Sequence, residues 1–477
     1  MDVDKLWIVN EAIQSALQTP YHVIFEGLLV IWILRLIFSK PHKIPDKEEK
    51  LTAKEKKELV DLWKPEPLAP PVEKTLAETR PYRLVNGQVG KNIVINGHKC
   101  KNFASLNFLG LVGNKRVDDK IEKCIQNYGV GTCGPRTFYG TFDIHLELEK
   151  KLAEFMGAEE AVIYSYGFAT VLSAIPAYAK KGDIIFADEA VSFAVQKGLQ
   201  GSRSKVVYFK HNDMDDLEDK LKQQEKMDKK DPKKAAVVRK FMVVEGIYMN
   251  SGQICDLPKL VEFKYKYKVR LFVEESLSFG VLGKHGRGVT EHFNIPISKV
   301  DLVIACMENS LASGGGFTCG RHYVAGSQRL SAVGYVFSVS LPPLLAGAAL
   351  EGLKISEENP EIFARLRQKA SFFQNLLKGI KGIKLVGYPE SPCFHLRRLH
   401  PVTPEKDLEF LHDVVDKCEK NGICITVATR TKAEVLSEWP ASIRIAVSVQ
   451  MSEKCLKEAA KVICHAVKEA FAEQRKS

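Results

Sequence analysis

The segment DLVIACMENSLASGGGFTCG, residues 301–320, joins a short apolar run to a glycine-rich turn. Its first six residues have the pattern of a strand that is buried on both faces. Similar runs precede it, and stretches with helical patterning separate them. They are AVIYSY (161–166), DIIFAD (183–188), KFMVVE (240–245) and VRLFVEE (269–275). This alternation predicts an α/β fold with a mostly parallel sheet and helices on both faces.

The pattern changes after the LPP at 341–343. A long helix is predicted over 344–380, and then strands near 383–387, 422–427 and 442–448 and a closing helix from 452. Residues 222–240 read as a solvated insertion in the larger domain. The predicted parts are a membrane anchor with a charged helix (1–62), a proline-rich linker (63–90), a large domain (91–343) and the long helix with a smaller α+β domain (344–477).

Residues 21–38, YHVIFEGLLVIWILRLIF, are almost wholly apolar. Their length suits a helix that crosses the hydrocarbon core of a membrane, although a buried core helix is the alternative. Four lysines follow between residues 40 and 50, whereas Lys5 is the only cation among the first twenty residues. The positive-inside rule then predicts a single-pass helix, with a lumenal N-terminus and the bulk of the chain in the cytosol.

The charge and the cysteine content of the chain limit the classes of partner and compartment that are expected. The net charge is +11, but the lysines are spread along the chain without a nucleic-acid motif, so membrane lipid is the expected anionic partner and no nucleic acid is expected. The 11 cysteines are scattered without a C-x-x-C pair. This usage favours a reducing compartment and argues against a disulfide framework or a metal site.

Six segments stand where an α/β fold binds its ligands, at the carboxyl ends of the strands. They are GTCGPRTFYG (131–140), YSYGFAT (164–170), FADEAVSFA (186–194), VEESLSFGVLGKHGRG (273–288), ACMENSLASGGGFTCG (305–320) and FSVSLPP (337–343). In this order they resemble the α-oxoamine synthase family of fold-type I pyridoxal-phosphate (PLP) enzymes, over roughly residues 90–470. The resemblance implies a large PLP-transferase-like domain, a small C-terminal domain, and dimers with active sites at the subunit interface.

The chemistry of that family needs a lysine for the Schiff base and an acid at the pyridine nitrogen. It also uses a stacking aromatic ring, usually histidine. Aligned on the glycines Gly315–Gly316, the family pattern T-F-S-K-x-F-G-x-x-G-G-Y places Asn309 at the lysine position. The acid of the D-E-A-H-S pattern is lengthened to Glu274, and its histidine is Leu277. The stacking histidine corresponds to Ser192.

A carboxamide is not nucleophilic, so these departures predict a subunit without a cofactor of its own. Arg444 stands where the family binds the substrate carboxylate, but the nearby histidine position is Met451. Together with the N-terminal segment, these features resemble the long-chain-base subunit 1 group of eukaryotic serine palmitoyltransferases. The resemblance implies a heterodimer with a homologous subunit that holds PLP and condenses L-serine with palmitoyl-CoA to 3-ketosphinganine at the endoplasmic reticulum membrane. It also implies small activating subunits and Orm-type regulators.

Two loops are expected to complete the partner's active site, with structural packing as the alternative role for each residue. The candidates are Cys133, Arg136, Tyr139, Phe337, Ser338 and Ser340. Two other functions stay open. One is a self-sufficient PLP acyltransferase with an unconventional lysine, for which Lys284 is a candidate, although its surrounding glycines favour a structural surface turn. The other is a pure membrane scaffold that recruits regulators through residues 1–60.

Overall fold

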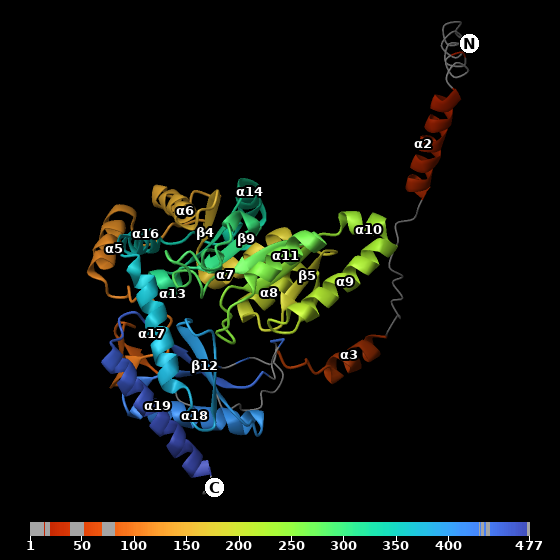
Figure 1. Cartoon of the computed structure of the whole chain (residues 1–477). Coiled ribbons are helices and arrows are strands. Elements are labelled where there is room, and N and C mark those ends of the chain that lie inside the picture. Colours follow the sequence, from red (N-terminus) through yellow and green to blue (C-terminus); the bar gives the residue numbers. More distant parts are fainter. Residues whose placement is uncertain are drawn as a thin grey trace. The chain divides into compact units, whose positions relative to one another are not determined.

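The computed structural model describes residues 14, 20–38, 52–68, 82–428, 430, 434–435 and 439–474 (Figure 1). The chain divides into two units, Met1–Thr79 and Arg80–Ser477. Residues 39–51 and 69–81 lie outside the described ranges, and with them parts of the predicted charged helix and proline-rich linker.

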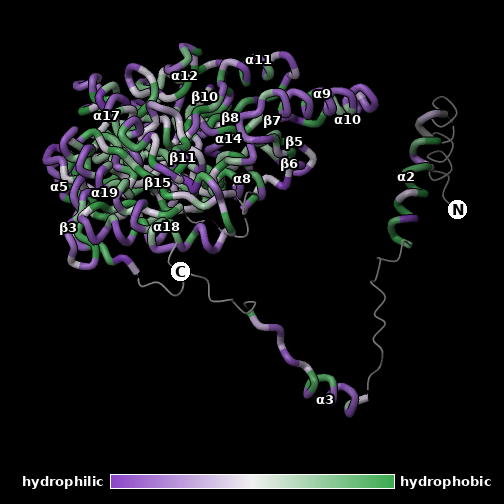
Figure 2. Tube along the Cα trace, turned by 60° about the horizontal axis from the view of Figure 1, so that its bottom comes forward, coloured by the Kyte–Doolittle hydropathy of each residue, from purple (hydrophilic) through white to green (hydrophobic). Residues whose placement is uncertain are grey.

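The described part of the first unit contains α2 (Pro20–Phe38) and α3 (Ala53–Leu62). The tube of α2 is largely hydrophobic in Figure 2. Thr52 and Glu55 form a reciprocal capping box that satisfies backbone N–H groups at the start of α3. No helix in the described ranges has both the length and the apolar character that crossing a membrane requires. The transmembrane span predicted at 21–38 is therefore not shown by the structure.

A seven-stranded sheet forms the centre of the second unit, in the order β4-β10-β9-β8-β7-β5-β6. β10 runs antiparallel to β4 and β9, and the other neighbours pair in parallel, which confirms the predicted mostly parallel sheet. The strands are β4 (Glu160–Tyr164), β5 (Ile184–Asp188), β6 (Lys205–Phe209), β7 (Lys240–Glu245), β8 (Arg270–Glu274), β9 (Leu302–Cys306) and β10 (Gly316–Gly320).

Helices connect and precede these strands. They are α5 (Lys115–Tyr128), α6 (Asp143–Met156), α7 (Gly167–Tyr178), α8 (Phe193–Ser202), α9 (Met214–Lys230), α10 (Pro232–Val237), α11 (Leu257–Tyr267), α12 (Val289–His292), the 3₁₀ turn η1 (Ile297–Lys299), α13 (Glu308–Leu311), α14 (His322–Ser331) and α15 (Val333–Val336). The predicted insertion at 222–240 consists of the end of α9, all of α10 and the start of β7. α10 has no buried residue, in agreement with a solvated segment.

The C-terminal part begins with α16 (Pro343–Glu358) and α17 (Glu361–Leu377). A single helix over 344–380 was predicted, but the chain breaks at Asn359 and Pro360, because proline lacks the N–H of the helical hydrogen bond and clashes with the preceding turn. An antiparallel sheet β11-β12-β15-β14 follows, with α18 (Pro404–Lys420) and α19 (Glu453–Gln474). Its strands are β11 (Ile383–Val386), β12 (Cys393–Arg398), β14 (Thr426–Ala428) and β15 (Ser442–Ala446).

A third sheet joins distant parts of the chain. It contains β1 (Val85–Asn86), β2 (Asn92–Ile95), β3 (His98–Asn102) and β13 (Ile423–Cys424). β3 pairs in parallel with β13. Residues 92–102 therefore lie beside a strand of the C-terminal part, although the sequence pattern had assigned them to the large domain that was expected to begin at residue 91.

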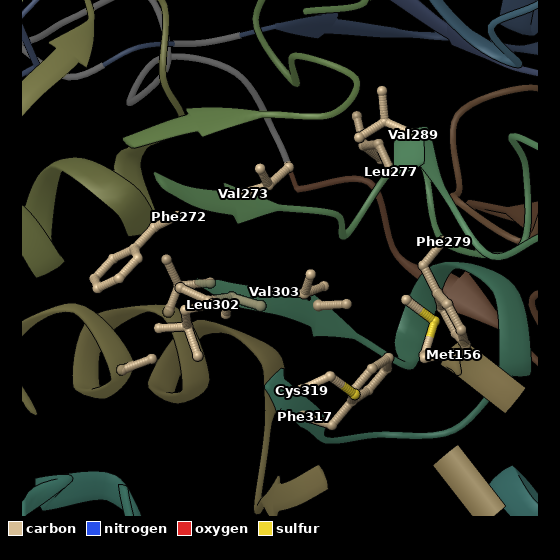
Figure 3. Close-up of a cluster of buried hydrophobic side chains, with 14 of the residues drawn as sticks. Met156, Phe272, Val273, Leu277, Phe279, Val289, Leu302, Val303, Phe317 and Cys319 are labelled. Atoms are coloured by element: carbon tan, nitrogen blue, oxygen red, sulfur yellow. The ribbon is translucent and has the colours of Figure 1, made fainter. Parts of the chain in front are cut away.

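Buried apolar side chains hold the seven-stranded sheet against its surroundings (Figure 3). Phe279 and Phe317 meet edge to face with ring centroids 5.0 Å apart, and Phe279 also meets Phe155. Burial of one such side chain is worth about 1.5–3 kcal/mol. Leu277 and Val289 belong to the same cluster and lie side by side in Figure 3. This core anchors the ends of β8 and β9, where the candidate site begins.

Candidate functional site

Polar side chains gather where the parallel strands end. β5, β7 and β8 end at Asp188, Glu245 and Glu274, all of which are buried. Glu245 and Glu274 face each other in register on neighbouring strands. Because carboxyl ends of parallel strands meet at one edge of a sheet, these groups form a site at the edge where the sequence predicted one.

Asn309, at the expected lysine position, lies in the short helix α13 and is buried. Its Nδ2 donates to the carbonyl oxygen of Ser276 at 2.8 Å and lies 3.2 Å from the Sγ of Cys306. The backbone carbonyl oxygen of Asn309 accepts from the N–H of Phe108 at 2.9 Å. The side-chain amide nitrogen thus links the segment after β9 to the turn after β8 through its hydrogen bond to Ser276.

The two neighbouring acids have an unusual electrostatic environment. Burial, and then the charge of Glu245, raises the pKa of Glu274. Burial also raises the pKa of Glu245. Glu274 accepts from the N–H of Ser276 at 2.9 Å, while Glu245 accepts from the N–H groups of Ser192 and Met249. Two buried carboxyl groups this close retain protons more readily than isolated ones, since a second negative charge is unfavourable.

Two positions that would carry histidine in the family have other surroundings. Ser192 is the N-cap residue of α8, and its backbone N–H, rather than a ring, faces Glu245. Leu277 packs in the hydrophobic core beside Val289 (Figure 3). No polar group is needed at Leu277, because the side chain is 2% exposed among apolar neighbours. The structure therefore places Ser192, Glu274 and Asn309 at the strand edge and Leu277 in the core beneath it.

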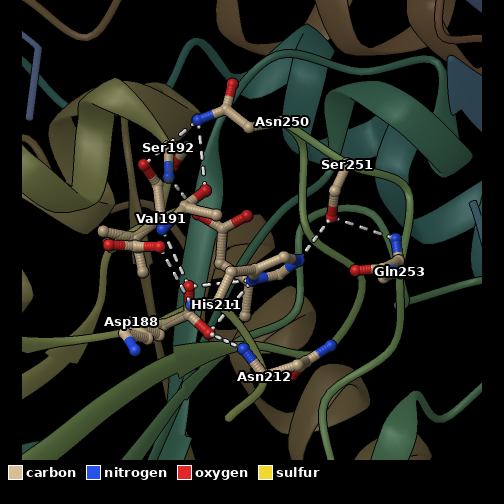
Figure 4. Close-up of polar contacts among 12 residues, drawn as sticks. Asp188, Val191, Ser192, His211, Asn212, Asn250, Ser251 and Gln253 are labelled. Carbon is tan, nitrogen blue, oxygen red and sulfur yellow. Dashed lines mark hydrogen bonds and ion pairs between the residues drawn. The ribbon is translucent and has the colours of Figure 1, made fainter. Parts of the chain in front are cut away.

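A polar network that the sequence reasoning missed lies next to this edge (Figure 4). His211 Nδ1 lies 2.9 Å from Oδ1 of Asp188, and Nε2 lies 2.9 Å from Oγ of Ser251. Asp188 also accepts from the N–H of Asn212 at 2.9 Å. The alignment resembles a nucleophilic triad, but Ser251 is fully buried, so we assign the network to bracing the loops after β5 and β6. The available signal was a histidine two residues after the end of a strand.

Three arginines of the C-terminal part approach the same region. Arg397 lies over the ring of Trp439, with Cζ 4.7 Å from the centroid, and burial lowers the pKa of Arg397 to about 10. Arg397 and Arg430 both donate to the carbonyl oxygen of Asn250. Among the described residues, the buried Nε atoms of Arg397 and Arg444 have no hydrogen-bond partner. This cluster suits an anion such as a carboxylate; Arg444 was predicted, whereas Arg397 and Arg430 were missed.

The two predicted interface loops lie side by side. An isolated bridge pairs Pro135 with Val339, and Oγ of Ser340 donates to the carbonyl oxygen of Gly134 at 3.0 Å. Thr137 donates to the carbonyl oxygen of Val336. The structure therefore brings segments 131–141 and 336–340 together. Ser340 itself is 3% exposed, which assigns it to holding the loops in contact.

Exposed side chains cover these joined loops. Cys133 and Tyr139 are exposed and have φ of 55° and 65°, in the left-handed region that side chains rarely adopt. Phe337 is 74% exposed, and the Oγ atoms of Ser338 and Ser165 lie 3.2 Å apart. We define the loop surface as Cys133, Phe138, Tyr139, Val333, Phe337 and Val339, all exposed.

Arg136 differs from the other predicted interface residues. Its guanidinium forms two hydrogen bonds to Glu149, of 2.9 and 3.1 Å, and a third to Thr141. The side chains of Arg136 and Glu149 are 4% and 7% exposed. This geometry favours the structural role for Arg136, since its donors are directed into its own chain.

Lys284, the alternative lysine for a self-sufficient enzyme, lies in an exposed turn. It lines a surface pocket together with His285, Glu291 and Arg367. The described lining of that pocket includes neither Glu274 nor Asn309. Lys284 is thus part of a separate surface feature.

Comparisons with known proteins agree with this architecture. A family model for aminotransferase class I and II matches residues 98–463. Long chain base biosynthesis protein 1b of Oryza sativa subsp. japonica is 43% identical over 433 residues, 91% of this chain and 88% of that protein. Serine palmitoyltransferase 1 of Dictyostelium discoideum is 42% identical, with 93% of each chain covered.

Among solved structures, a Sphingomonas wittichii serine palmitoyltransferase superposes with a TM-score of 0.74 at 23% identity, covering 90% of this chain and 99% of that one. That identity supports the fold alone. The sequence relatives go further: the chain belongs to the aminotransferase class I and II family and, within it, to the group of long chain base biosynthesis protein 1 and serine palmitoyltransferase 1.

Proposed function

We propose that this chain is the non-catalytic subunit of a serine palmitoyltransferase. It supports the condensation of L-serine with palmitoyl-CoA to 3-ketosphinganine in a homologous partner, the first step of sphingolipid synthesis. The names of its relatives support the activity. The observation that carries the non-catalytic assignment is Asn309. Its amide occupies the expected lysine position and donates a hydrogen bond to the carbonyl oxygen of Ser276.

The residues at the strand edge do not fit PLP as a cofactor of this chain. PLP supplies an electron sink that needs a nucleophilic amine for attachment and a charged acid at its ring nitrogen. Asn309 provides no amine, and burial raises the pKa of Glu274 so that its charged form is disfavoured. Ser192 provides no ring to stack on it, and Leu277, at the position of the family's second histidine, is part of the hydrophobic core. We therefore assign PLP to the partner subunit.

The loop surface is the proposed contact with that partner. It carries Phe138, Tyr139 and Phe337 in exposed positions on two loops that are joined by backbone contacts. A contiguous exposed apolar patch of this kind marks protein–protein contact sites. The family resemblance implies dimers with active sites at the interface, so the occupant we propose is the homologous lysine-bearing subunit.

Membrane attachment is part of the same proposal. In the first unit, α2 exposes large apolar side chains that include Ile31, Trp32 and Phe38. Exposed apolar surface of this kind needs cover from lipid or protein. We propose that α2 attaches the chain to the endoplasmic reticulum membrane, where small activating subunits and Orm-type regulators assemble with it. The lumenal N-terminus stays a prediction. Resistance of the full chain, but not of a version without residues 1–40, to alkaline extraction would support attachment by this region.

Borohydride reduction of the purified complex, followed by peptide mapping, tests where PLP is held. The proposal expects the cofactor on a lysine of the partner and none on this chain. An adduct on Lys284 or any other lysine of this chain would establish the self-sufficient enzyme instead. Turnover that is unaffected by Phe337→Ala and Tyr139→Ala, with assembly intact, would favour the pure scaffold.

A further inference from the structure

Helix α7 begins at the same edge as Asn309. β4 and β9 both run antiparallel to β10, so they run in the same direction, and α7 follows β4 directly. The N-cap residue of α7 is Tyr166, and its side chain makes no cap hydrogen bond. The first N–H groups of a helix have no partner within it, and together with the helix dipole they attract an anion.

That helix start already has an anion from the chain itself. The N–H of Gly167, the first residue of α7, donates to Oε1 of Glu308 at 3.1 Å. Glu308 immediately precedes Asn309, and Asn309 is fixed by its hydrogen bond to Ser276. A Cβ at Gly167 would lie 2.6 Å from the Cβ of Cys306 and 3.2 Å from Oε2 of Glu308, so only glycine allows this close approach.

We propose that Glu308 is a built-in substitute for the phosphate of a cofactor. The start of α7 contacts Glu308, which is the residue before the expected lysine position. A helix start that attracts anions at this place is where a phosphorylated cofactor would place its phosphate. In this chain the carboxylate of Glu308 fills that place. A phosphate would bring a second negative charge close to the carboxylate that the N–H of Gly167 already contacts, and like charges at this distance repel.

The inference rests on the proposed non-catalytic function. The presence of Glu308 in place of a phosphate has two consequences. First, exclusion of PLP does not depend on Asn309 alone, because the phosphate position is occupied as well. Second, the chain itself supplies an anion to a helix start that could otherwise accept one from a ligand. The start of α7 is thereby capped in the absence of any cofactor, and the adjoining loop surface keeps its shape for the partner.

The experiment measures stabilisation of the full chain by inorganic phosphate. Wild type, Glu308→Ala and Glu308→Gln are purified in detergent, and their thermal midpoints are recorded with increasing phosphate and with sodium chloride at matched ionic strength. Glu122→Ala, an exposed glutamate of α5, is the control. Glu308→Ala is expected to lower the midpoint by about 1–2 °C and to recover with millimolar phosphate.

Wild type and Glu122→Ala are expected to respond to phosphate no more than to sodium chloride. Glu308→Gln keeps an oxygen acceptor for the N–H of Gly167 but removes the charge, so a smaller loss and a partial recovery are expected. Equal responses of wild type and Glu308→Ala would overturn the inference, as would a Glu308→Ala variant that folds but gains nothing from phosphate. The readout is independent of turnover, so it can fail while the subunit assignment stands.

Discussion

Replacement of Arg136 by alanine tests whether this residue anchors its own chain or acts in the partner's active site. Its guanidinium lies against Glu149 with both side chains nearly inaccessible to solvent. Nε donates to Oγ1 of Thr141 at 3.0 Å, and Cζ lies 5.3 Å from the ring centroid of Tyr335. Alanine removes all of these contacts and leaves the carboxylate of Glu149 buried.

The size of the effect follows from this geometry. Loss of one member of a buried ion pair costs about 3–5 kcal/mol, because the remaining charge has no counterion. Arg329 lies 3.7 Å from Glu149, and the N–H of Ile163 donates to it at 3.0 Å, so part of that charge stays compensated. We expect a loss of about 3 kcal/mol in the free energy of unfolding.

The expected change in thermal midpoint is modest for a unit of this size. At about 2.1 cal/mol/K of unfolding entropy per residue, a unit of roughly 400 residues shifts by about 3–4 °C for that loss. Scanning fluorimetry of the complex would measure the midpoint, and turnover would be recorded on the same samples. The matched control is the pair Arg136→Met with Glu149→Leu, which removes both charges and should regain most of the stability.

An unchanged midpoint with lost turnover in Arg136→Ala would refute this reasoning. It would show instead that Arg136 acts on the acyl-CoA or cofactor held by the partner, the role that the sequence pattern had suggested. A double variant as unstable as the single one would also contradict the ion-pair explanation, because no buried charge would remain in it.

Other variants test the remaining parts of the site. Asn309→Lys should yield neither activity nor a borohydride-trapped cofactor on this chain, since the neighbouring positions remain unsuited to PLP. Burial raises the pKa of Glu275 from 4.5 to about 7; the folded state therefore holds this proton more tightly, and the contribution of Glu275 to stability should fall by roughly 3 kcal/mol between about pH 4.5 and 7, in addition to the contributions of Glu245 and Glu274. Urea unfolding across this range should show a smaller fall for Glu275→Gln. Phe337→Ala should weaken binding to the homologous subunit by about 10–100-fold in a titration. Cys133, the exposed cysteine, should react with iodoacetamide in the free chain and be protected in the complex.

The opposite result in each experiment would contradict the corresponding prediction. A trapped adduct in Asn309→Lys would show that a lysine alone restores the site. An identical pH dependence of wild type and Glu275→Gln would mean that this carboxyl is charged in the folded state. Unchanged binding of Phe337→Ala, or equal labelling of Cys133 in both states, would place the partner on another surface.

The alternation of apolar runs determined most of the second unit by itself. Runs at 240–245 and 301–306 became β7 and β9 almost residue for residue, because a strand buried on both faces needs an unbroken apolar sequence. The residue types at Asn309, Leu277 and Ser192 are likewise given directly by the sequence, since a side chain's reactive group is a local property. The run over 344–380 was misjudged only at Pro360, where one residue overrides a helical pattern.

The tertiary structure decided which distant groups meet. Gly167 and Glu308 are 141 positions apart, and the three arginines converge from separate parts of the C-terminal region. Arg136 pairs with Glu149 on the helix that follows it, and this contact favours the structural role that was the alternative for Arg136. The spacing of apolar residues indicates which face of a helix or strand is buried. Which side chains meet between elements depends instead on how whole sheets and helices pack. For that reason the departures from the family pattern could be read from the chain, while the contact between Glu308 and the start of α7 required the fold.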